Sequence, residues 1–175
     1  MKKRIVEYKN KLSEIEDYIQ KDFISYFSEI DYSQFSKEIQ IFRINNEEDL
    51  NKVYAGIGFY IILTDYEFED NNCIFEYDKH KAIYRGHSYF TKKRLLSHLA
   101  NERYKRERKP SEPNYKVCLK IKDNINGINI NQEPYKNWNW IVIIHKIRNS
   151  SKIIREQVEL AFDKLYNKPC KSREI

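Results

Sequence analysis

Apolar residues recur every three or four positions over residues 3–30, and neither glycine nor proline interrupts this stretch. The apolar positions are Ile5, Tyr8, Leu12, Ile15, Tyr18, Ile19, Phe23, Tyr26, Phe27 and Ile30. Such spacing is typical of an amphipathic helix, and a break near Asp22 would divide it into two helices. The pattern predicts an N-terminal helical extension over residues 1–55, which also holds a strand-like stretch at 38–44.

Alternating or continuous apolar stretches predict the strands of a second region, residues 56–175. Strand signals lie at 58–64, 73–77, 81–86 and 138–147, and two further ones, 115–121 and 127–130, lie in an insertion at about 103–135. Helix signals place an N-cap at Asn46 before a short helix to about Tyr54, an N-cap at Thr91 before a helix to about Arg106, and caps at 149–151 before a helix to about Asn167. The order predicts an α+β fold, in which a small central antiparallel sheet of about three core strands is flanked by helices and carries an inserted β segment.

Composition narrows the class of protein. The chain has 175 residues, of which 41% are hydrophobic and 14% aromatic, enough for a buried core and too many for a disordered chain. No apolar run approaches the ~20 residues of a membrane span, and the basic start Met1–Arg4 is not followed by the apolar segment of a signal peptide. The three cysteines are widely spaced and form no C-x-x-C pair. We therefore expect a cytoplasmic protein, in a reducing compartment, without disulfides or a thiolate zinc site.

The net charge of +6 is concentrated in residues 92–109, where eight Lys and Arg face two Asp and Glu. The remainder of the chain is balanced, with 24 basic and 24 acidic residues. A charge run can simply be a solvated helix face, but this concentration favours a polyanionic partner, nucleic acid above all. The side chains predicted to contact nucleic acid are His87, Lys92, Lys93, Arg103, Lys105, Arg106, Arg108 and Lys109.

Two tripeptides in the predicted strands, Gly58-Phe59-Tyr60 and Tyr84-Arg85-Gly86, are followed by Arg94 and His98 and by an acidic residue on the last helix. In this order and on these elements, the set resembles the GIY-YIG endonuclease superfamily over roughly residues 56–172. Phe59 and Arg85 depart from the family's tripeptides, and Ser172 stands nearest to the place of its usual asparagine. Three of the chain's four glycines, Gly56, Gly58 and Gly86, fall within this part of the sequence.

The chemistry of these residue types agrees with phosphodiester hydrolysis. A tyrosine with a pKa near ~10 acts as a base only beside cations that stabilise its phenolate. Arg94 supplies such a cation and can also bind a phosphate, and His98, four residues later, lies on the same helix face. The resemblance implies that one of the two tyrosines activates water, and we assign this role to Tyr60 and an orienting role to Tyr84. Arg85 should point to the opposite face of the sheet from Tyr84.

The acidic residue is either Glu159 or Glu156. At 100° per residue, Glu159 lies about 115° and Glu156 about 175° from the apolar centre of the last helix. Glu156 should therefore point into solvent, and Glu159 should flank the buried face, which makes Glu159 the preferred metal ligand. One carboxylate with waters and phosphate oxygens suits Mg²⁺ or Mn²⁺ rather than zinc.

The sequence thus predicts a divalent-metal-dependent endonuclease with DNA as the expected substrate. The resemblance implies a role in restriction, phage defence or a mobile element. A second interpretation is a catalytically inactive module that binds nucleic acid or regulates through the same fold. A third gives the helix at 3–30 a role in binding a partner or a second copy in a homodimer, instead of folding back on its own domain.

Overall fold

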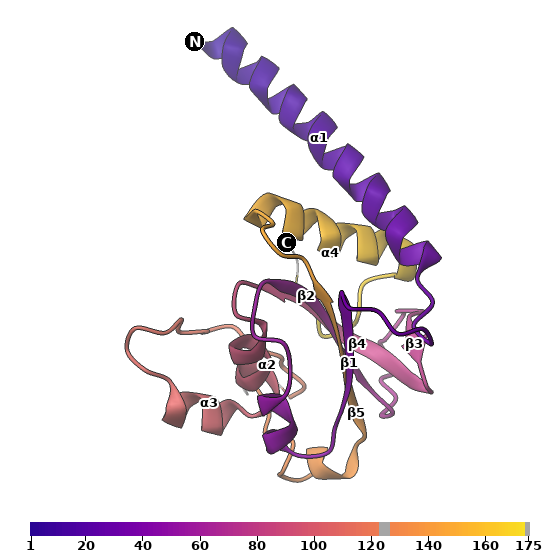
Figure 1. Cartoon of the computed structure of the whole chain (residues 1–175), viewed down its shortest axis with the longest axis vertical. Coiled ribbons are helices and arrows are strands. Elements are labelled where there is room, and N and C mark those ends of the chain that lie inside the picture. Colours follow the sequence, from indigo (N-terminus) through magenta and orange to yellow (C-terminus); the bar gives the residue numbers. More distant parts are fainter. Residues whose placement is uncertain (123–126, 174–175) are drawn as a thin grey trace.

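The computed structural model describes residues 1–122 and 127–173. Its elements are α1 (Lys2–Glu29), β1 (Ile39–Ile44), η1 (Glu47–Asn51), β2 (Gly58–Thr64), β3 (Glu76–Tyr77), β4 (His80–Ser88), α2 (Thr91–Leu99), α3 (Asn101–Glu107), η2 (Tyr135–Asn137), β5 (Trp140–Lys146) and α4 (Lys152–Tyr166). The α+β class is confirmed (Figure 1). The sheet has five antiparallel strands in the order β1-β5-β2-β4-β3, instead of about three.

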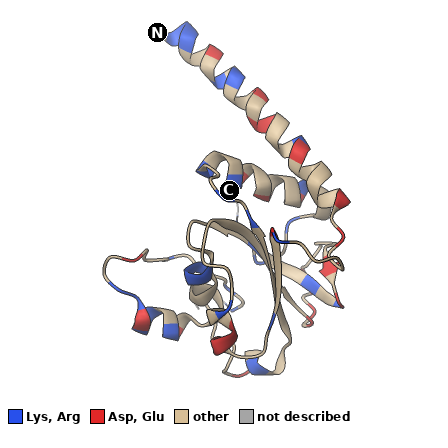
Figure 2. Cartoon of the chain, viewed as in Figure 1, with Lys and Arg blue, Asp and Glu red and all other residues tan. Residues whose placement is uncertain are grey.

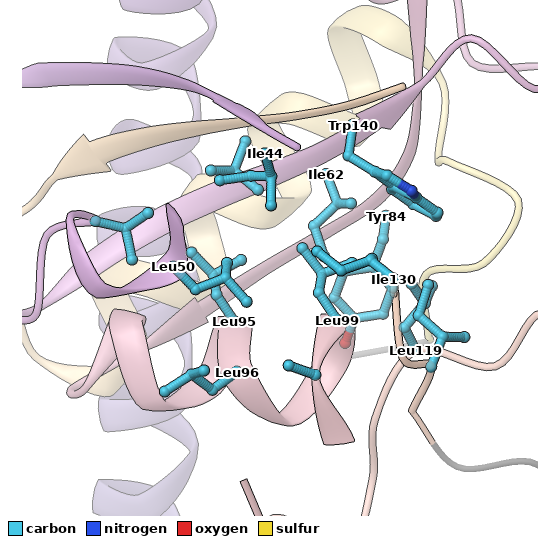
Figure 3. Packing of buried hydrophobic residues seen from close by; sticks show 14 of the residues in the cluster. Ile44, Leu50, Ile62, Tyr84, Leu95, Leu96, Leu99, Leu119, Ile130 and Trp140 are labelled. Carbon is cyan, nitrogen blue, oxygen red and sulfur yellow. The ribbon is translucent and has the colours of Figure 1, made fainter. Parts of the chain in front are cut away.

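Strand β2 lies at the centre of the sheet, and its alternating side chains separate two buried layers. Tyr60 and Ile62 belong to the cluster on the α2 side of the sheet. Figure 3 shows Ile62 in this cluster with Leu95, Leu99 and Trp140. The intervening residues Phe59, Ile61 and Leu63 face α4 and the C-terminal part of α1, where they pack around Phe27 and Phe162. All seven residues of β2 are buried, as expected for a central strand covered on both faces.

The N-terminal region is part of this sheet rather than a purely helical extension. Strand β1 pairs with β5 along its whole length, from Ile39 opposite His145 to Ile44 opposite Trp140. Helix α1 is continuous and has no break near Asp22. Only its C-terminal part packs against α4, and its N-terminal half projects away from the domain (Figure 1).

The predicted helix from Thr91 to Arg106 is two helices, because the chain turns at Ala100. The backbone N–H groups of Ile128 and Ile130 donate to the carbonyl oxygens of His98 and Leu99, which a continuous helix would use internally. Among the described residues of 115–121 and 127–130 there is no strand, only one isolated bridge between Ala100 and Asn129. The prediction of an inserted β segment is therefore wrong.

The predicted helix caps are right in two of three places. Asn46 accepts a hydrogen bond from the backbone N–H of Glu48 at 2.9 Å, and Ser151 accepts one from Ile154 at 3.3 Å. Thr91 is the first residue of α2 rather than its cap. Its hydroxyl donates to the carbonyl of Gly56 at 2.8 Å, which fixes the start of α2 against the chain that enters β2.

Candidate active site

A cleft of about 280 Å³ lies at the edge of β4 and brings most of the predicted site residues together. Its walls are formed by Tyr60, Tyr84, Arg85, Gly86, His87, Arg94, Val117, Glu156, Glu159 and Arg173. Tyr60 and Tyr84 belong to the α2 face of the sheet, whereas Glu159 lies on α4, which covers the other face. The two sets meet because the cleft opens at the sheet edge.

The two tyrosines lie on one face of neighbouring strands. Tyr60 pairs with Gly86 and Ile62 with Tyr84, so the tyrosines are diagonal neighbours rather than directly opposite. Their rings are stacked, with centroids 6.3 Å apart and an interplanar angle of 14°. Tyr60 is 1% and Tyr84 5% exposed. The tyrosines therefore form the floor of the cleft, with the mouth of the cleft left to other residues.

Gly86 gives the Tyr60 hydroxyl its place. A Cβ built on Gly86 would lie 2.5 Å from Tyr60 Oη and 2.8 Å from Cζ, closer than side chains approach each other. The space that Gly86 leaves open is thus filled by the Tyr60 side chain. Gly58 acts differently, because a Cβ there would lie 2.9 Å from the His145 carbonyl oxygen and 3.1 Å from Thr91 Oγ1.

His98 lies behind the cleft, fully buried, and holds Tyr60 from that side. The backbone N–H of Leu119 donates to His98 Nδ1 at 2.7 Å, so Nδ1 must be unprotonated. The proton of the neutral ring is then on Nε2, which donates to Tyr60 Oη at 2.8 Å. Burial and the nearby Arg94 charge hold the pKa of His98 well below its usual value, in agreement with this neutral tautomer.

Arg94 is the cation whose charge lowers the pKa of both tyrosines most. Its guanidinium also lies 4.8 Å from the ring centre of Tyr115. Burial nevertheless raises the pKa of Tyr60 well above 10, with Tyr84 adding to the rise, and Arg94 offsets only part of the increase. Burial also raises the pKa of Tyr84. Both tyrosines are therefore protonated in this state, in contrast to the phenolate expected beside Arg94.

Glu159 is held in a buried network with Arg85. Arg85 Nη1 lies 2.6 Å from Glu159 Oε2, and Nε and Nη2 bind Asp163 at 3.0 and 2.6 Å. His87 Nδ1 lies 2.7 Å from Glu159 Oε1. Arg85 does point away from Tyr84, as predicted, but this orientation places it against the candidate acid. Each carboxylate oxygen of Glu159 already has one partner and keeps one further lone pair.

Glu156 faces the cleft instead of open solvent. Its side chain is 28% exposed and forms an ion pair with Lys152 at 3.2 Å. Glu156 and Glu159 thus give the cleft two carboxylates, one partly free and one tied to Arg85. Among the described residues no group of three or more His, Cys, Asp and Glu could hold a metal. The pair fits Mg²⁺, which commonly binds one or two carboxylates and completes its shell with water and phosphate.

The C-terminal segment, where the sequence pointed only to Ser172, also contributes backbone contacts and a cation to the site. Ser172 Oγ accepts a hydrogen bond from the backbone N–H of Arg85 at 2.9 Å, and the N–H of Lys171 donates to the carbonyl of Ile83 at 2.9 Å. These bonds attach the segment to the free edge of β4 and bring Arg173 to the cleft wall. Arg173 is therefore a second cation beside Arg94, and its charge also lowers the pKa of His98.

The basic segment is divided between structural and exposed side chains. Arg103 is 9% exposed and is held by Glu48, Glu107 and Asn51, so it fastens α3 to η1. His87 lies at the cleft, where it contacts Glu159. The other predicted contacts form two groups: Lys92, Lys93 and Arg108 are partly buried, and Lys105, Arg106 and Lys109 are exposed. Figure 2 shows these charges on α2, α3 and the loop that follows.

No family model matches this chain, and neither a curated protein nor a solved structure matches it. The resemblance to the GIY-YIG superfamily therefore stays a prediction that depends on the residues themselves. None of the helices within the described residues is long and apolar enough to cross a membrane.

Proposed function

We propose that the chain is a divalent-metal-dependent endonuclease that hydrolyses nucleic-acid phosphodiester bonds, with DNA as its substrate. The observation that carries this proposal is the position of Tyr60 Oη. It accepts a hydrogen bond from neutral His98 and forms the floor of a cleft that also contains Arg94 and two carboxylates. Perturbed titratable groups gathered in one cleft are typical of catalytic sites.

The hydrogen bonds define what Tyr60 can do in the reaction. Its oxygen already accepts from His98 Nε2–H, so its own proton is directed to a partner in the cleft, where we place the attacking water. To act as a base, Tyr60 first loses that proton to solvent, and His98 and Arg94 stabilise the phenolate. The phenolate then accepts a proton from the attacking water as the water oxygen bonds to phosphorus and the ester oxygen leaves. Tyr84 keeps Tyr60 in position by stacking.

The two arginines would bind the phosphate, and the two carboxylates would bind the metal ion. Arg94 and Arg173 place positive charge at the cleft wall, where a phosphate and the charge that develops on it would lie. Glu159 and Glu156 are the residues that would hold Mg²⁺ or Mn²⁺. When bound, that ion supplies a water of lowered pKa and neutralises charge on the phosphate.

A catalytically inactive nucleic-acid-binding module is the second candidate. One observation favours it: both oxygens of Glu159 are already engaged, by Arg85 and by His87. A carboxylate neutralised by a buried guanidinium attracts a cation less strongly than a free one. In this second interpretation the cleft would bind a phosphate through Arg94 and Arg173 without breaking its ester bond.

Cleavage assays separate the two candidates. Plasmid DNA, single-stranded DNA and RNA are incubated with Mg²⁺, Mn²⁺ or EDTA, and the wild type is compared with Tyr60→Phe, Arg94→Ala and Glu159→Gln. We expect metal-dependent cutting of DNA that falls about 100-fold or more in each variant. Binding without cutting in every metal would refute the nuclease and support the binding module. An active Glu159→Gln together with an inactive Glu156→Gln would move the metal-ligand role to Glu156.

Asp163→Asn is the matched control for Glu159→Gln. Both carboxylates lie on α4 and bind Arg85, but Asp163 is not part of the cleft wall. We therefore expect Asp163→Asn to lower stability while it keeps cutting within a few-fold of the wild type. Equal loss of cutting in the two variants would mean that Glu159 acts only by holding Arg85.

The exposed basic residues are tested by salt dependence. Lys105, Arg106 and Lys109 lie outside the cleft, so their replacement by alanine should weaken DNA binding equally for all sequences. Each lost phosphate contact should reduce the slope of log K against log salt by about 0.9. An unchanged slope would show that this segment is a solvated surface.

A further inference from the structure

The N-terminal half of α1 exposes an apolar face that nothing in the described chain covers. Every residue from Met1 to Ile15 is exposed, and contact with α4 begins only near Gln20, which hydrogen-bonds to Gln157. Figure 1 shows this half of the helix projecting into solvent. An isolated helix of this length is marginal in water, because tertiary packing supplies most helix stability.

The uncovered face has the spacing of a coiled-coil seam. Its exposed residues are Ile5, Tyr8, Leu12 and Ile15, and the half-buried Ile19 continues the row, with separations that alternate between three and four positions. The first four are 47%, 63%, 42% and 56% exposed. The same side of α1 continues into Phe23 and Phe27, which pack on the domain. The seam is therefore an extension of a packing face rather than a scatter of single apolar residues.

The charges along this half of α1 indicate what covers the seam. Residues 2–11 contain five Lys and Arg against one Glu, and residues 13–22 contain four Asp and Glu against one Lys (Figure 2). A second copy in antiparallel orientation sets the basic half of each helix against the acidic half of the other. A parallel copy would place like charges side by side, which coiled coils avoid.

We propose that the chain forms a homodimer through an antiparallel pair of α1 helices, centred near Leu12. The seam residues of the two copies pack against each other, and the domains lie at opposite ends of the pair. This inference does not depend on the proposed nuclease activity, because it uses only α1. A dimer of this form would carry two copies of the cleft, one at each end.

Sedimentation equilibrium of the full chain over a hundredfold range of concentration tests the proposal. We expect a monomer–dimer equilibrium, and Leu12→Lys should raise the dimer dissociation constant about tenfold or more, because it places a charge in the apolar seam. Asn10→Lys is the matched control, since Asn10 lies about 180° from the seam at 100° per residue. A wild type that stays monomeric would overturn the proposal, and so would a Leu12→Lys variant that associates as the wild type does.

Orientation is measured with a spin label at Lys3→Cys in a Cys170→Ser background, since Cys73 and Cys118 are buried. In the antiparallel pair the two labels should lie about 25–30 Å apart, from the rise of 1.5 Å per residue. A separation near the ~10 Å of neighbouring helix axes would indicate a parallel pair and overturn the proposal. Loss of dimer in Leu12→Lys with unchanged thermal unfolding of the domain would confirm that only the seam is affected.

Discussion

The substitution Arg85→Met removes a buried guanidinium that two carboxylates face. Arg85 is 3% exposed and lies 2.6 Å from both Glu159 and Asp163. Methionine replaces most of the alkyl volume but leaves both carboxylates without their cation. Breaking a buried ion pair by removing one partner costs about 3–5 kcal/mol. Asp163 is 16% exposed and Glu159 keeps His87 as a partner, so we expect the lower end, about 3 kcal/mol.

Urea and thermal unfolding, followed by circular dichroism, measure this loss. For a chain of this size about 3 kcal/mol corresponds to a fall in Tm of about 6–12 °C. Arg43→Met is the matched control, because the ion pair of Arg43 with Asp78 is exposed and worth about 0–1 kcal/mol. A loss below about 1 kcal/mol in Arg85→Met, similar to that of the control, would refute the reasoning.

A combined variant identifies the cause of the loss. Adding Glu159→Gln and Asp163→Asn to Arg85→Met removes the two unpaired charges, so stability should partly recover. A combined variant that is no more stable than Arg85→Met would show that the loss comes from packing.

Two further predictions concern the histidines and the glycine of the site. Burial lowers the pKa of His145 to about 3 and the pKa of His98 well below 6.5. Below about pH 6.5 the unfolded chain therefore binds more protons than the folded chain. The free energy of unfolding should fall as the pH drops through this range, by up to about 2.7 kcal/mol per pH unit for the two histidines together. Urea midpoints at pH 7, 6 and 5 measure this slope, and a slope unchanged in His145→Gln would contradict it. Gly86→Ala should cost about 1–3 kcal/mol and reduce cutting, because its Cβ displaces Tyr60, and full activity would contradict the close contact.

The elements with strong local patterns could be predicted closely. Strand β2 was expected at residues 58–64 and forms over Gly58–Thr64, since a continuous apolar stretch bounded by polar residues defines a buried strand without help from distant segments. The break at Ala100 could not be predicted, because its cause is hydrogen bonding from Ile128 and Ile130, almost 30 residues away. The edge strand β1 carried a clear strand pattern, but its partner β5 lies about 100 residues later.

In the candidate site, too, the features set by local sequence could be predicted and those set by distant segments could not. The spacing of Tyr60, Tyr84 and Arg94 brought them into one cleft, as expected from their order on strands and helix. Glu156 was misplaced because a helical wheel gives only the direction from the helix axis. A helical wheel contains no information on distant residues such as Val117 and Arg173, which extend the cleft wall beyond the sheet.

The position of the cleft follows from how β3 and the C-terminal segment together cover the edge of β4. Tyr60 and Glu159 lie on opposite faces of the sheet, so a reaction that uses both can take place only where an edge lets the faces meet. Strand β3 pairs only with the first residues of β4. The C-terminal segment hydrogen-bonds to β4 further along, at Ile83 and Arg85. The next residue, Gly86, has no side chain to separate the faces, and Tyr60 Oη reaches the edge over it. Under the proposed function, the C-terminal segment is therefore as necessary to the site as the two tripeptides, because it closes the edge up to the glycine and places Arg173 at the cleft.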